Sequence, residues 1–299
     1  MVNNIVLPER KNTMRRTASL VALFLIAASS LAIARIAVIP EYLSFPVLIK
    51  FSETSSASAL YFKTESNAYL VTAKHVLYDL QSMTLQQSEA DLVSYVDVAT
   101  NPKKIVRRIF LGELEKDGRI LFHPKHDLVV VRFGDVLKDS PAQIVFENRM
   151  FKNVEGESPL MCVMEPNTLR YDDVGISNEV YLFGYPRSIG LKQIPQIDYD
   201  MPLLRRGIVA GKNEATQTIV VDCPAYYGNS GGPVCQVEQE GLTTKYTIIG
   251  IVSQFVPFVE QWENKTHHYT NSEISNSGYS VVTPIDAMFE LIERIEKAE

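Results

Sequence analysis

Short runs of β-favouring residues, separated by polar turns, make up most of the first half of the chain. Many of the runs alternate apolar with polar residues, and they are rich in Val, Ile, Tyr and Phe, which suit a pleated, half-buried surface. Helical stripes hardly interrupt them, and His75–Leu80 has room for only one short helical turn. The predicted strands of this first set are Val47–Phe51, Ser58–Lys63, Ala68–Thr72, Leu92–Val98, Lys104–Leu111, Arg119–Phe122 and Leu128–Phe133.

A second set of strands follows an irregular stretch, residues 137–176, which is rich in Pro, Asn, Asp and Glu and is interpreted as a connection with insertions. Residues 257–277 are predicted to form a polar surface loop. Two such sets predict an all-β fold of two packed antiparallel six-stranded β-barrels, with a functional site in the cleft between them. The second set is Val180–Tyr185, Leu203–Ala210, Gln217–Val221, Gly232–Val237, Lys245–Gln254 and Tyr279–Val282.

The last residues predict a helix. Thr283 is suited to cap it and Pro284 to its first turn. The apolar residues that follow recur with a helical period, which indicates packing against the strands rather than a ligand site. The expected organisation is therefore an N-terminal barrel over about 46–135, a connection over 136–176, a C-terminal barrel over 177–283 and a helix over 284–298.

The first residues carry the pattern of a targeting segment. Arg15 and Arg16 precede an uncharged apolar run, residues 18–34, which ends in the A-x-A cleavage pattern Ala32-Ile33-Ala34. Residues 1–34 are therefore predicted to be a cleaved signal peptide. The alternative is a single membrane anchor, although the run is just short of the ~20 residues that span a bilayer. Both interpretations place residues 35–299 outside the cytoplasm, either periplasmic or secreted, or held at the inner membrane by the uncleaved segment.

Composition argues against some classes of partner but does not decide whether two of the cysteines form a disulfide. The net charge is −6, and no basic cluster follows the first segment, which argues against nucleic acid as a partner. Three cysteines are too few for a disulfide framework, and their spacing does not predict a metal site. Cys223 and Cys235 either form a disulfide or are, like Cys162, small buried apolar residues.

The stretch Gly228-Asn229-Ser230-Gly231-Gly232 has the chemistry of a nucleophile loop. A serine hydroxyl is a weak nucleophile at neutral pH, so it needs a base to take its proton and donors to hold the developing charge. Glycines let the backbone turn sharply and let a substrate carbonyl approach main-chain N–H groups. The main-chain N–H groups of Gly228 and Ser230 are spaced so that both could donate to one developing negative charge, which would make them an oxyanion hole.

Two upstream residues have suitable positions to assist Ser230. His75 comes just after the apolar run that ends at Thr72, and Asp127 comes just before the run Leu128–Phe133. A histidine held at a strand end can act as a general base, and a carboxylate at the lip of another strand can orient it and stabilise its charged form. The ordered set His75, Asp127 and Ser230 is therefore a candidate catalytic triad.

With these residues in place, the chain resembles the chymotrypsin/trypsin-like serine peptidases, and most of all their HtrA-type branch. The resemblance rests on the segments 58–62 and 70–76, 127–131, 206–211 and 221–233. It implies a chymotrypsin-like fold and an endopeptidase that cleaves protein or peptide substrates through an acyl-enzyme. It also implies that no cofactor and no metal is needed. The oligomeric state is not predicted.

The same resemblance implies a set of substrate-binding residues. Ser253 matches the family serine that supports the aspartate and lines the substrate strand, and Phe255 falls near the specificity pocket. Pro224 offers no carboxylate at the expected pocket base, so a small or medium apolar residue before the cut is favoured over Arg or Lys. Asn229 stands where zymogen-type members carry an aspartate that pairs with a freed N-terminus, so activation by propeptide cleavage is not expected. The PDZ domain that HtrA-type members usually carry after the protease is not expected here either. The full set is Pro224, Tyr227, Ser253, Gln254 and Phe255.

Three other interpretations compete with an active peptidase. The nucleophile loop also satisfies G-x-S-x-G, the α/β-hydrolase pattern of an esterase, which requires a helix directly after Ser230. A second alternative is a dormant protease-fold protein that binds or regulates without turnover. His123 and His126 suggest a metal site, but no third ligand accompanies them, so they are interpreted as surface residues.

Overall fold

The computed structural model describes residues 40–98, 100–187, 194–240 and 243–297. The predicted signal peptide, residues 1–34, lies outside this part of the chain. Among the described residues, no helix is both long enough and apolar enough to cross a membrane.

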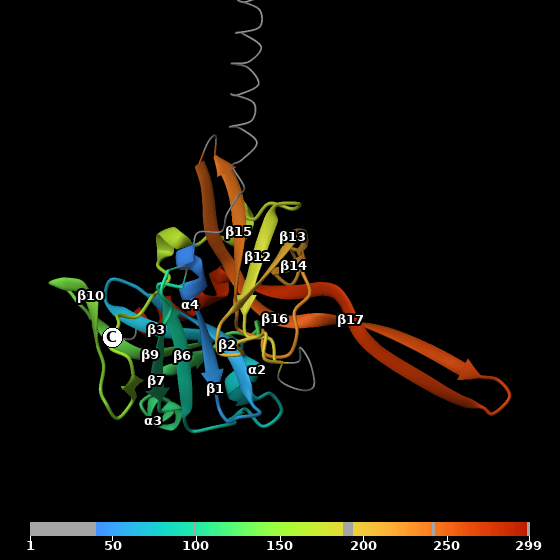
Figure 1. Cartoon of the computed structure of the whole chain (residues 1–299), viewed down its shortest axis with the longest axis horizontal. Coiled ribbons are helices and arrows are strands. Elements are labelled where there is room, and N and C mark those ends of the chain that lie inside the picture. The colour runs from blue at the N-terminus through green and yellow to red at the C-terminus, as the bar shows by residue number, and fades with distance from the viewer. Residues whose placement is uncertain (1–39, 99, 188–193, 241–242, 298–299) are drawn as a thin grey trace, which may run out of the picture. The chain divides into compact units, whose positions relative to one another are not determined.

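The first half of the chain forms one antiparallel sheet of nine strands (Figure 1). Each strand that the sequence predicts in this region is present, within a few residues of its predicted ends. The strands are β1 (Pro46–Lys50), β2 (Ser56–Lys63), β3 (Asn67–Thr72), β6 (Ala90–Val96), β7 (Lys103–Ile109), β8 (Ile120–Phe122), β9 (Val129–Leu137), β10 (Ser140–Val145) and β11 (Phe151–Glu155). Their order is β10-β9-β3-β2-β1-β6-β7-β11, and β8 pairs with β9.

The sheet has nine strands instead of the six of the predicted barrel, because two strands from residues 137–176 join the seven runs listed above. β10 pairs with β9, and β11 pairs with β7, so both strands extend the sheet at its edges. Their burial explains the difference, because only Phe151 of β11 is buried and the strands show little apolar alternation. Phe151 stacks on Phe133 at 4.4 Å between ring centroids and anchors the core of the sheet together with Tyr61.

The second half of the chain forms a closed antiparallel barrel of six strands, as predicted. Its strands are β12 (Glu179–Gly184), β13 (Leu203–Asn213), β14 (Thr218–Asp222), β15 (Pro233–Glu240), β16 (Thr243–Asn264) and β17 (Tyr269–Pro284). They close in the order β12-β13-β14-β17-β16-β15. A separate apolar core fills the barrel, with Val180, Leu182, Val209, Val221 and Ile249 among its buried residues.

The prediction of a polar loop over residues 257–277 is wrong. β16 and β17 continue past the barrel as a two-stranded ribbon (Figure 1), paired from Pro257 with Asn276 to Asn264 with Tyr269. Both faces of this ribbon are exposed, so the sequence lacks the apolar alternation that marks a half-buried strand. Asn264 closes its turn, because its Oδ1 accepts hydrogen bonds from the N–H groups of Thr266 and His267.

The C-terminal helix α4 (Ile285–Lys297) is present as predicted and buries its apolar stripe. Asp286 in its first turn accepts a hydrogen bond from the N–H of Tyr171 at 2.8 Å, which ties the helix to the connection between the two strand sets. The remaining elements are short: η1 (Pro40–Ser44), α2 (Lys74–Leu77), β4 (Tyr78–Asp79), β5 (Thr84–Leu85), α3 (Leu111–Lys116), η2 (Glu165–Asn167) and η3 (Tyr171–Asp173).

All three cysteines are buried free thiols, which decides between the two alternatives for Cys223 and Cys235. Burial raises the pKa of Cys162 to about 12 and that of Cys223 to about 11. Thiolates, not thiols, are the reactive form, so these residues pack as small apolar side chains.

Candidate active site

His75 is placed by the end of a fully buried strand. All six residues of β3 are buried, and α2 begins two residues after Thr72. The backbone that carries the imidazole is therefore held by a firmly packed strand. Its side chain is 36 % exposed, which leaves one edge of the ring open to a reacting group. Gln86 also holds the turn, donating from Nε2 to the carbonyl of His75 at 2.9 Å.

Asp127 contacts His75 through two hydrogen bonds. Nδ1 of His75 lies 2.6 Å from Oδ2 of Asp127, and the main-chain N–H of His75 donates to Oδ1 at 3.0 Å. Asp127 lies two residues before β9, which pairs with β3 from Thr72 and Val129 onward. The sheet therefore brings together two of the residues that the sequence singles out.

The loop around Ser230 packs tightly on the strands that lead to His75. Gly231 has a φ of +81°, and a Cβ on it would lie 2.1 Å from both the carbonyl oxygen of Ser58 and Oγ1 of Thr72. Only glycine fits this approach. Asn229 is buried and braces the loop from within, accepting a hydrogen bond from the N–H of Tyr226 at 2.9 Å.

Ser58, which sequence reasoning missed, joins the nucleophile loop to the histidine strand. Its N–H donates to the carbonyl of Ser230 at 2.9 Å, and its Oγ donates to the carbonyl of Gly228 at 2.7 Å. Its own carbonyl accepts from Oγ1 of Thr72 at 2.7 Å, three residues before His75. A fully buried serine inside an apolar strand is the signal that was available, because such a hydroxyl needs a partner.

One peptide bond in the loop before Ser230 has its orientation fixed by a hydrogen bond. The carbonyl of Tyr227 accepts a hydrogen bond from the N–H of Arg187 at 2.9 Å. In a trans peptide the C=O and N–H point in opposite directions, so the N–H of Gly228 points away from Arg187. Within the described part of the chain, neither this N–H nor that of Ser230 makes a hydrogen bond, so both are available to a ligand oxygen.

The side chain of Ser230 is not joined to His75 in this structure. Its Oγ makes no hydrogen bond within the described part of the chain, although the loop that carries it rests on Ser58 and Thr72. The site therefore consists of a hydrogen-bonded His75–Asp127 pair beside a separately anchored serine loop.

Ser253 does not support Asp127, contrary to the expectation from the family resemblance. Its Oγ donates its proton to the carbonyl of Val281 at 3.0 Å. The reason is an irregularity in the pairing of β16 with β17 between Val252 and Gln254, which turns Ser253 toward β17. Ser253 remains on the strand expected to bind substrate, next to the exposed Gln254.

The other predicted substrate-binding residues lie on the loop that leads to Ser230 and on β16. The ring of Tyr227, which is 71 % exposed, contacts the ring of Phe255 edge to face at 5.6 Å between centroids. This pair links the nucleophile loop to β16. At the predicted pocket base, Pro224 is half-buried, and its neighbour Ala225 donates its N–H to the buried hydroxyl of Ser280 at 2.8 Å.

His123 is buried, which corrects its interpretation as a surface residue. Its Nδ1 accepts hydrogen bonds from the N–H groups of Lys125 and His126, so its Nε2 carries the proton that reaches Glu290 at 3.0 Å. This bond lowers the pKa of Glu290. No group of three or more metal-ligating side chains occurs among the described residues. The hydrogen bond between His123 and Glu290 therefore fixes α4 to the nine-stranded sheet.

The residues after Ser230 also rule out the α/β-hydrolase arrangement. That fold requires a helix directly after the nucleophile. Here β15 begins at Pro233 and enters the closed barrel instead.

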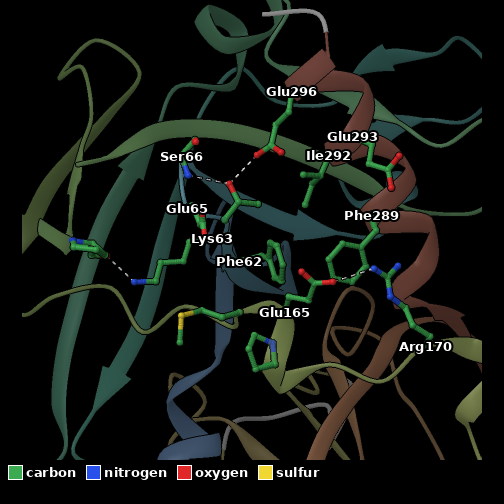
Figure 2. Close-up of a pocket in the computed structure, with 14 residues that line it drawn as sticks. Phe62, Lys63, Glu65, Ser66, Glu165, Arg170, Phe289, Ile292, Glu293 and Glu296 are labelled. Carbon is green, nitrogen blue, oxygen red and sulfur yellow. Dashed lines mark hydrogen bonds and ion pairs between the residues drawn. The ribbon is translucent and has the colours of Figure 1, made fainter. Parts of the chain in front are cut away.

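A cavity of about 650 Å³ lies away from these residues (Figure 2). Its lining includes the apolar side chains of Phe62, Phe289 and Ile292 and four glutamates, Glu65, Glu165, Glu293 and Glu296. It sits at the turn before β3, the opposite end of that strand from His75. The hydroxyl of Thr64 donates to Glu296 there, but no histidine is among the described lining residues, so we assign the candidate active site to His75, Asp127 and the Ser230 loop.

One family model matches more than half of the chain. The family model of the trypsin-like peptidase domain matches residues 57–242, a range that contains His75, Asp127 and Ser230. A search of curated proteins finds no match.

Several solved protease structures are similar to this chain. The HtrA-type protease AlgW with a tripeptide has 17 % sequence identity and a TM-score of 0.42, and the match covers 84 % of this chain and 59 % of that one. The serine endoprotease from Yersinia pestis has 12 % sequence identity and a TM-score of 0.43, and the match covers 86 % of this chain and 66 % of that one. The protease Anisep from Arthrobacter nicotinovorans has 11 % sequence identity and a TM-score of 0.41, and the match covers 80 % of this chain and 88 % of that one. This chain thus spans less than two thirds of the length of the first two.

Proposed function

The chain belongs to the trypsin-like peptidase family, and from that premise we propose that it is a serine endopeptidase whose catalytic triad is His75, Asp127 and Ser230. The observation that carries the proposal is the pair of hydrogen bonds, 2.6 and 3.0 Å, by which Asp127 holds both the ring and the main chain of His75. The serine loop anchored beside that pair supports it further.

Asp127 would set the protonation state that the reaction needs. With the ring proton held on Nδ1 by the carboxylate, Nε2 of His75 is left with a lone pair and can accept the proton of Ser230. The carboxylate also stabilises the imidazolium that forms. Catalytic hydrogen bonds are often long without substrate and tighten when it binds, which is consistent with the unpaired Oγ of Ser230.

The proposed reaction runs in two halves. Oγ of Ser230 attacks the scissile carbonyl carbon while its proton passes to His75, and the N–H groups of Gly228 and Ser230 hold the oxyanion. His75 then gives that proton to the leaving amine, and the acyl-enzyme remains. Water attacks the ester in the second half, its proton passes to His75, and the return of that proton to Ser230 releases the acid.

The residues around Ser230 support a preference for small or medium apolar side chains before the cut. The rings of Tyr227 and Phe255 contact each other between the nucleophile loop and β16, and two such rings would favour an apolar side chain of limited size. Pro224 offers no carboxylate at the pocket base to pair with Arg or Lys. We place the reaction outside the cytoplasm, as the pattern of residues 1–34 predicts.

Hydrolysis of an unfolded protein such as casein tests the proposal. The purified chain is expected to degrade it, and Ser230→Ala is expected to lower turnover by about 10⁴- to 10⁶-fold while circular dichroism shows an unchanged fold. Full activity of Ser230→Ala would refute the triad. A folded wild-type protein that neither hydrolyses casein nor reacts with an active-site probe would instead support the dormant alternative.

A further inference from the structure

The proposed mechanism leaves one prominent feature unused: the ribbon formed by residues 257–276 of β16 and β17, which we call the arm (Figure 1). In the described part of the chain, β15 pairs with β16 only as far as Ile251, and β14 pairs with β17 only from Tyr279 inward. Both outer edges of the arm therefore expose unpaired main-chain groups. A two-stranded ribbon is marginally stable alone, and an open edge is a template for another extended chain.

The register of the arm assigns its side chains to two faces, since directly opposed residues point the same way and neighbours alternate. One face carries three exposed aromatic residues: Phe258, Trp262 and Tyr269 are 51, 49 and 49 % exposed. Solvent exposure of three large rings on one narrow strip is typical of a surface that a partner covers.

Two carboxylates lie among these rings. Glu260 pairs directly with Glu273 across the ribbon, and like charges in that position destabilise a sheet. Among the described residues, neither forms an ion pair. A cation placed between them would relieve the repulsion, and the rings of Phe258 and Trp262, two residues to either side of Glu260, would attract the same cation. The face is thus suited to a Lys or Arg side chain.

Charge argues against a second copy of this chain as the occupant. Two copies meeting through this face would bring four carboxylates together, and the chain as a whole carries a charge of −6. An extended basic segment satisfies both features of the arm, because its main chain can pair with the open edge and its cations can meet the two glutamates.

The arm leads directly out of the strand expected to bind substrate. β16 is one strand from Ser253 through Phe255 into the arm, although its pairing with β17 is irregular between Phe255 and Pro257. Antiparallel pairing is the more stable arrangement, and it would lay the part of a substrate that precedes the scissile bond along the arm. With one-to-one pairing, Glu260 would meet a residue about five to nine positions before the cut.

We propose that the arm binds a basic, extended segment of the protein substrate, about five to nine residues before the scissile bond, between Glu260 and Glu273. This inference rests on the proposed function, because it assigns the occupant from the continuity of the arm with the substrate strand.

Trp262 gives a direct readout, because it is the single tryptophan of the chain. The full chain carrying Ser230→Ala is titrated with a 12-residue peptide of alternating Lys and Thr and with a matched peptide of alternating Glu and Thr. The Lys peptide is expected to change the emission of Trp262 saturably, and the Glu peptide is not. Adding Glu260→Gln and Glu273→Gln should weaken binding by about 10-fold or more.

Glu263→Gln is the matched control, since Glu263 lies on the opposite face of the arm. It should change the affinity by less than about 2-fold. Equal effects of the two sets of substitutions, or an unchanged Trp262 emission, would overturn the proposal. So would sedimentation velocity showing that the protein self-associates and that Glu260→Gln with Glu273→Gln strengthens the association, because the arm would then bind a second copy.

Labelling by a fluorophosphonate separates this inference from the proposed function. The Glu260→Gln, Glu273→Gln protein with an intact Ser230 should label as fast as the wild type, because the arm lies outside the triad. If the wild type labels and the titration does not discriminate between the peptides, only the inference about the arm fails. If the wild type does not label at Ser230, the proposed function fails regardless of the titration.

Discussion

The two halves of the candidate site are built in different ways. In the N-terminal sheet, His75 and Asp127 stand at the ends of buried strands and contact each other directly, side chain to side chain. In the C-terminal barrel, Ser230 sits on a loop whose position depends on main-chain atoms and on one small residue, Ser58, that reaches it from the other half. Substitutions in the first half should therefore affect mainly the catalytic chemistry, and substitutions in the second half should affect mainly the position of Ser230.

The largest expected effect is the loss of the direct contact in the first half. Asp127→Asn keeps the size of the side chain but supplies an amide that can donate to Nδ1, which favours the wrong tautomer of His75. We expect kcat/KM to fall by up to about 10⁴-fold with little change in Tm. The control is Asp135→Asn, at the exposed end of the same strand, which should leave kcat/KM unchanged. A loss of less than tenfold in Asp127→Asn would show that the pair is structural.

The close packing of the second half is tested by a single methyl group. In Gly231→Ala the new Cβ would lie 2.1 Å from the carbonyl oxygen of Ser58 and from Oγ1 of Thr72. The φ of +81° would also strain an alanine at this position. We expect the free energy of unfolding to fall by about 3 kcal/mol or more, together with activity. Gly211→Ala is the matched control, because nothing lies within 4 Å of its Cβ position. Equal stability of the two variants in urea denaturation would contradict the packing described here.

Ser58 links the two halves, so its hydroxyl should affect both stability and rate. Ser58→Ala leaves the buried carbonyl of Gly228 and N–H of Tyr185 without their partner, which should cost about 1 to 3 kcal/mol and lower kcat by about 10-fold through the nearby oxyanion peptide. Ser56→Ala, in the same strand, removes a hydroxyl that is buried without a hydrogen-bond partner and should be neutral or slightly stabilising. If both serines gave the same kcat and Tm, Ser58 would have no positioning role.

A smaller effect, dependent on pH, is expected where Asp200 joins the halves. This residue precedes β13 and pairs with Lys104 of β7 at 2.7 Å and with Lys50 of β1. Burial opposes its ionisation, but hydrogen bonds from Lys104 and Lys50 outweigh burial and hold its pKa below the ordinary value of 3.8. A carboxyl whose pKa is lowered by folding stabilises the protein above pH 3.8, and this contribution is lost as the pH falls through the lower folded value.

Asp200→Asn should therefore lower the free energy of unfolding by about 1 to 2 kcal/mol at neutral pH, and the difference from wild type should shrink as the pH falls below 3.8 toward the lower folded pKa. Urea denaturation between pH 7 and pH 3 measures this. Asp97→Asn, which removes an exposed ion pair with Lys103, should have almost no effect. A difference that stays constant with pH would exclude an ionic link between the halves.

The sequence predicts the first half of the site better than the second for a physical reason. His75 and Asp127 adjoin apolar runs whose β-periodicity is visible in the chain, so their positions at strand ends can be inferred locally. Ser58 bonds to Gly228, 170 residues away. A serine inside an apolar strand signals that its hydroxyl needs a partner, but nothing in the local sequence identifies a partner so distant. The same locality limits the prediction for Ser253, because the irregular pairing that turns it toward Val281 depends on the neighbouring strand.

The fold follows the same rule. Strands with one buried face were predicted within a few residues of their ends, and the closed barrel was predicted with its six strands. β10, β11 and the arm were missed because they expose most of their side chains, which removes the alternation on which the prediction depends. Exposed strands are specified by their pairing partners and turns, such as the one closed by Asn264.

The most direct test of the central claim, that these two halves form one working triad, is covalent labelling. The purified full chain is treated with a fluorophosphonate probe, and the adduct is mapped by mass spectrometry. The account predicts labelling at Ser230 that disappears in His75→Ala, since the hydroxyl needs the imidazole to lose its proton. Labelling at another residue, or labelling of Ser230 at an unchanged rate in His75→Ala, would contradict it.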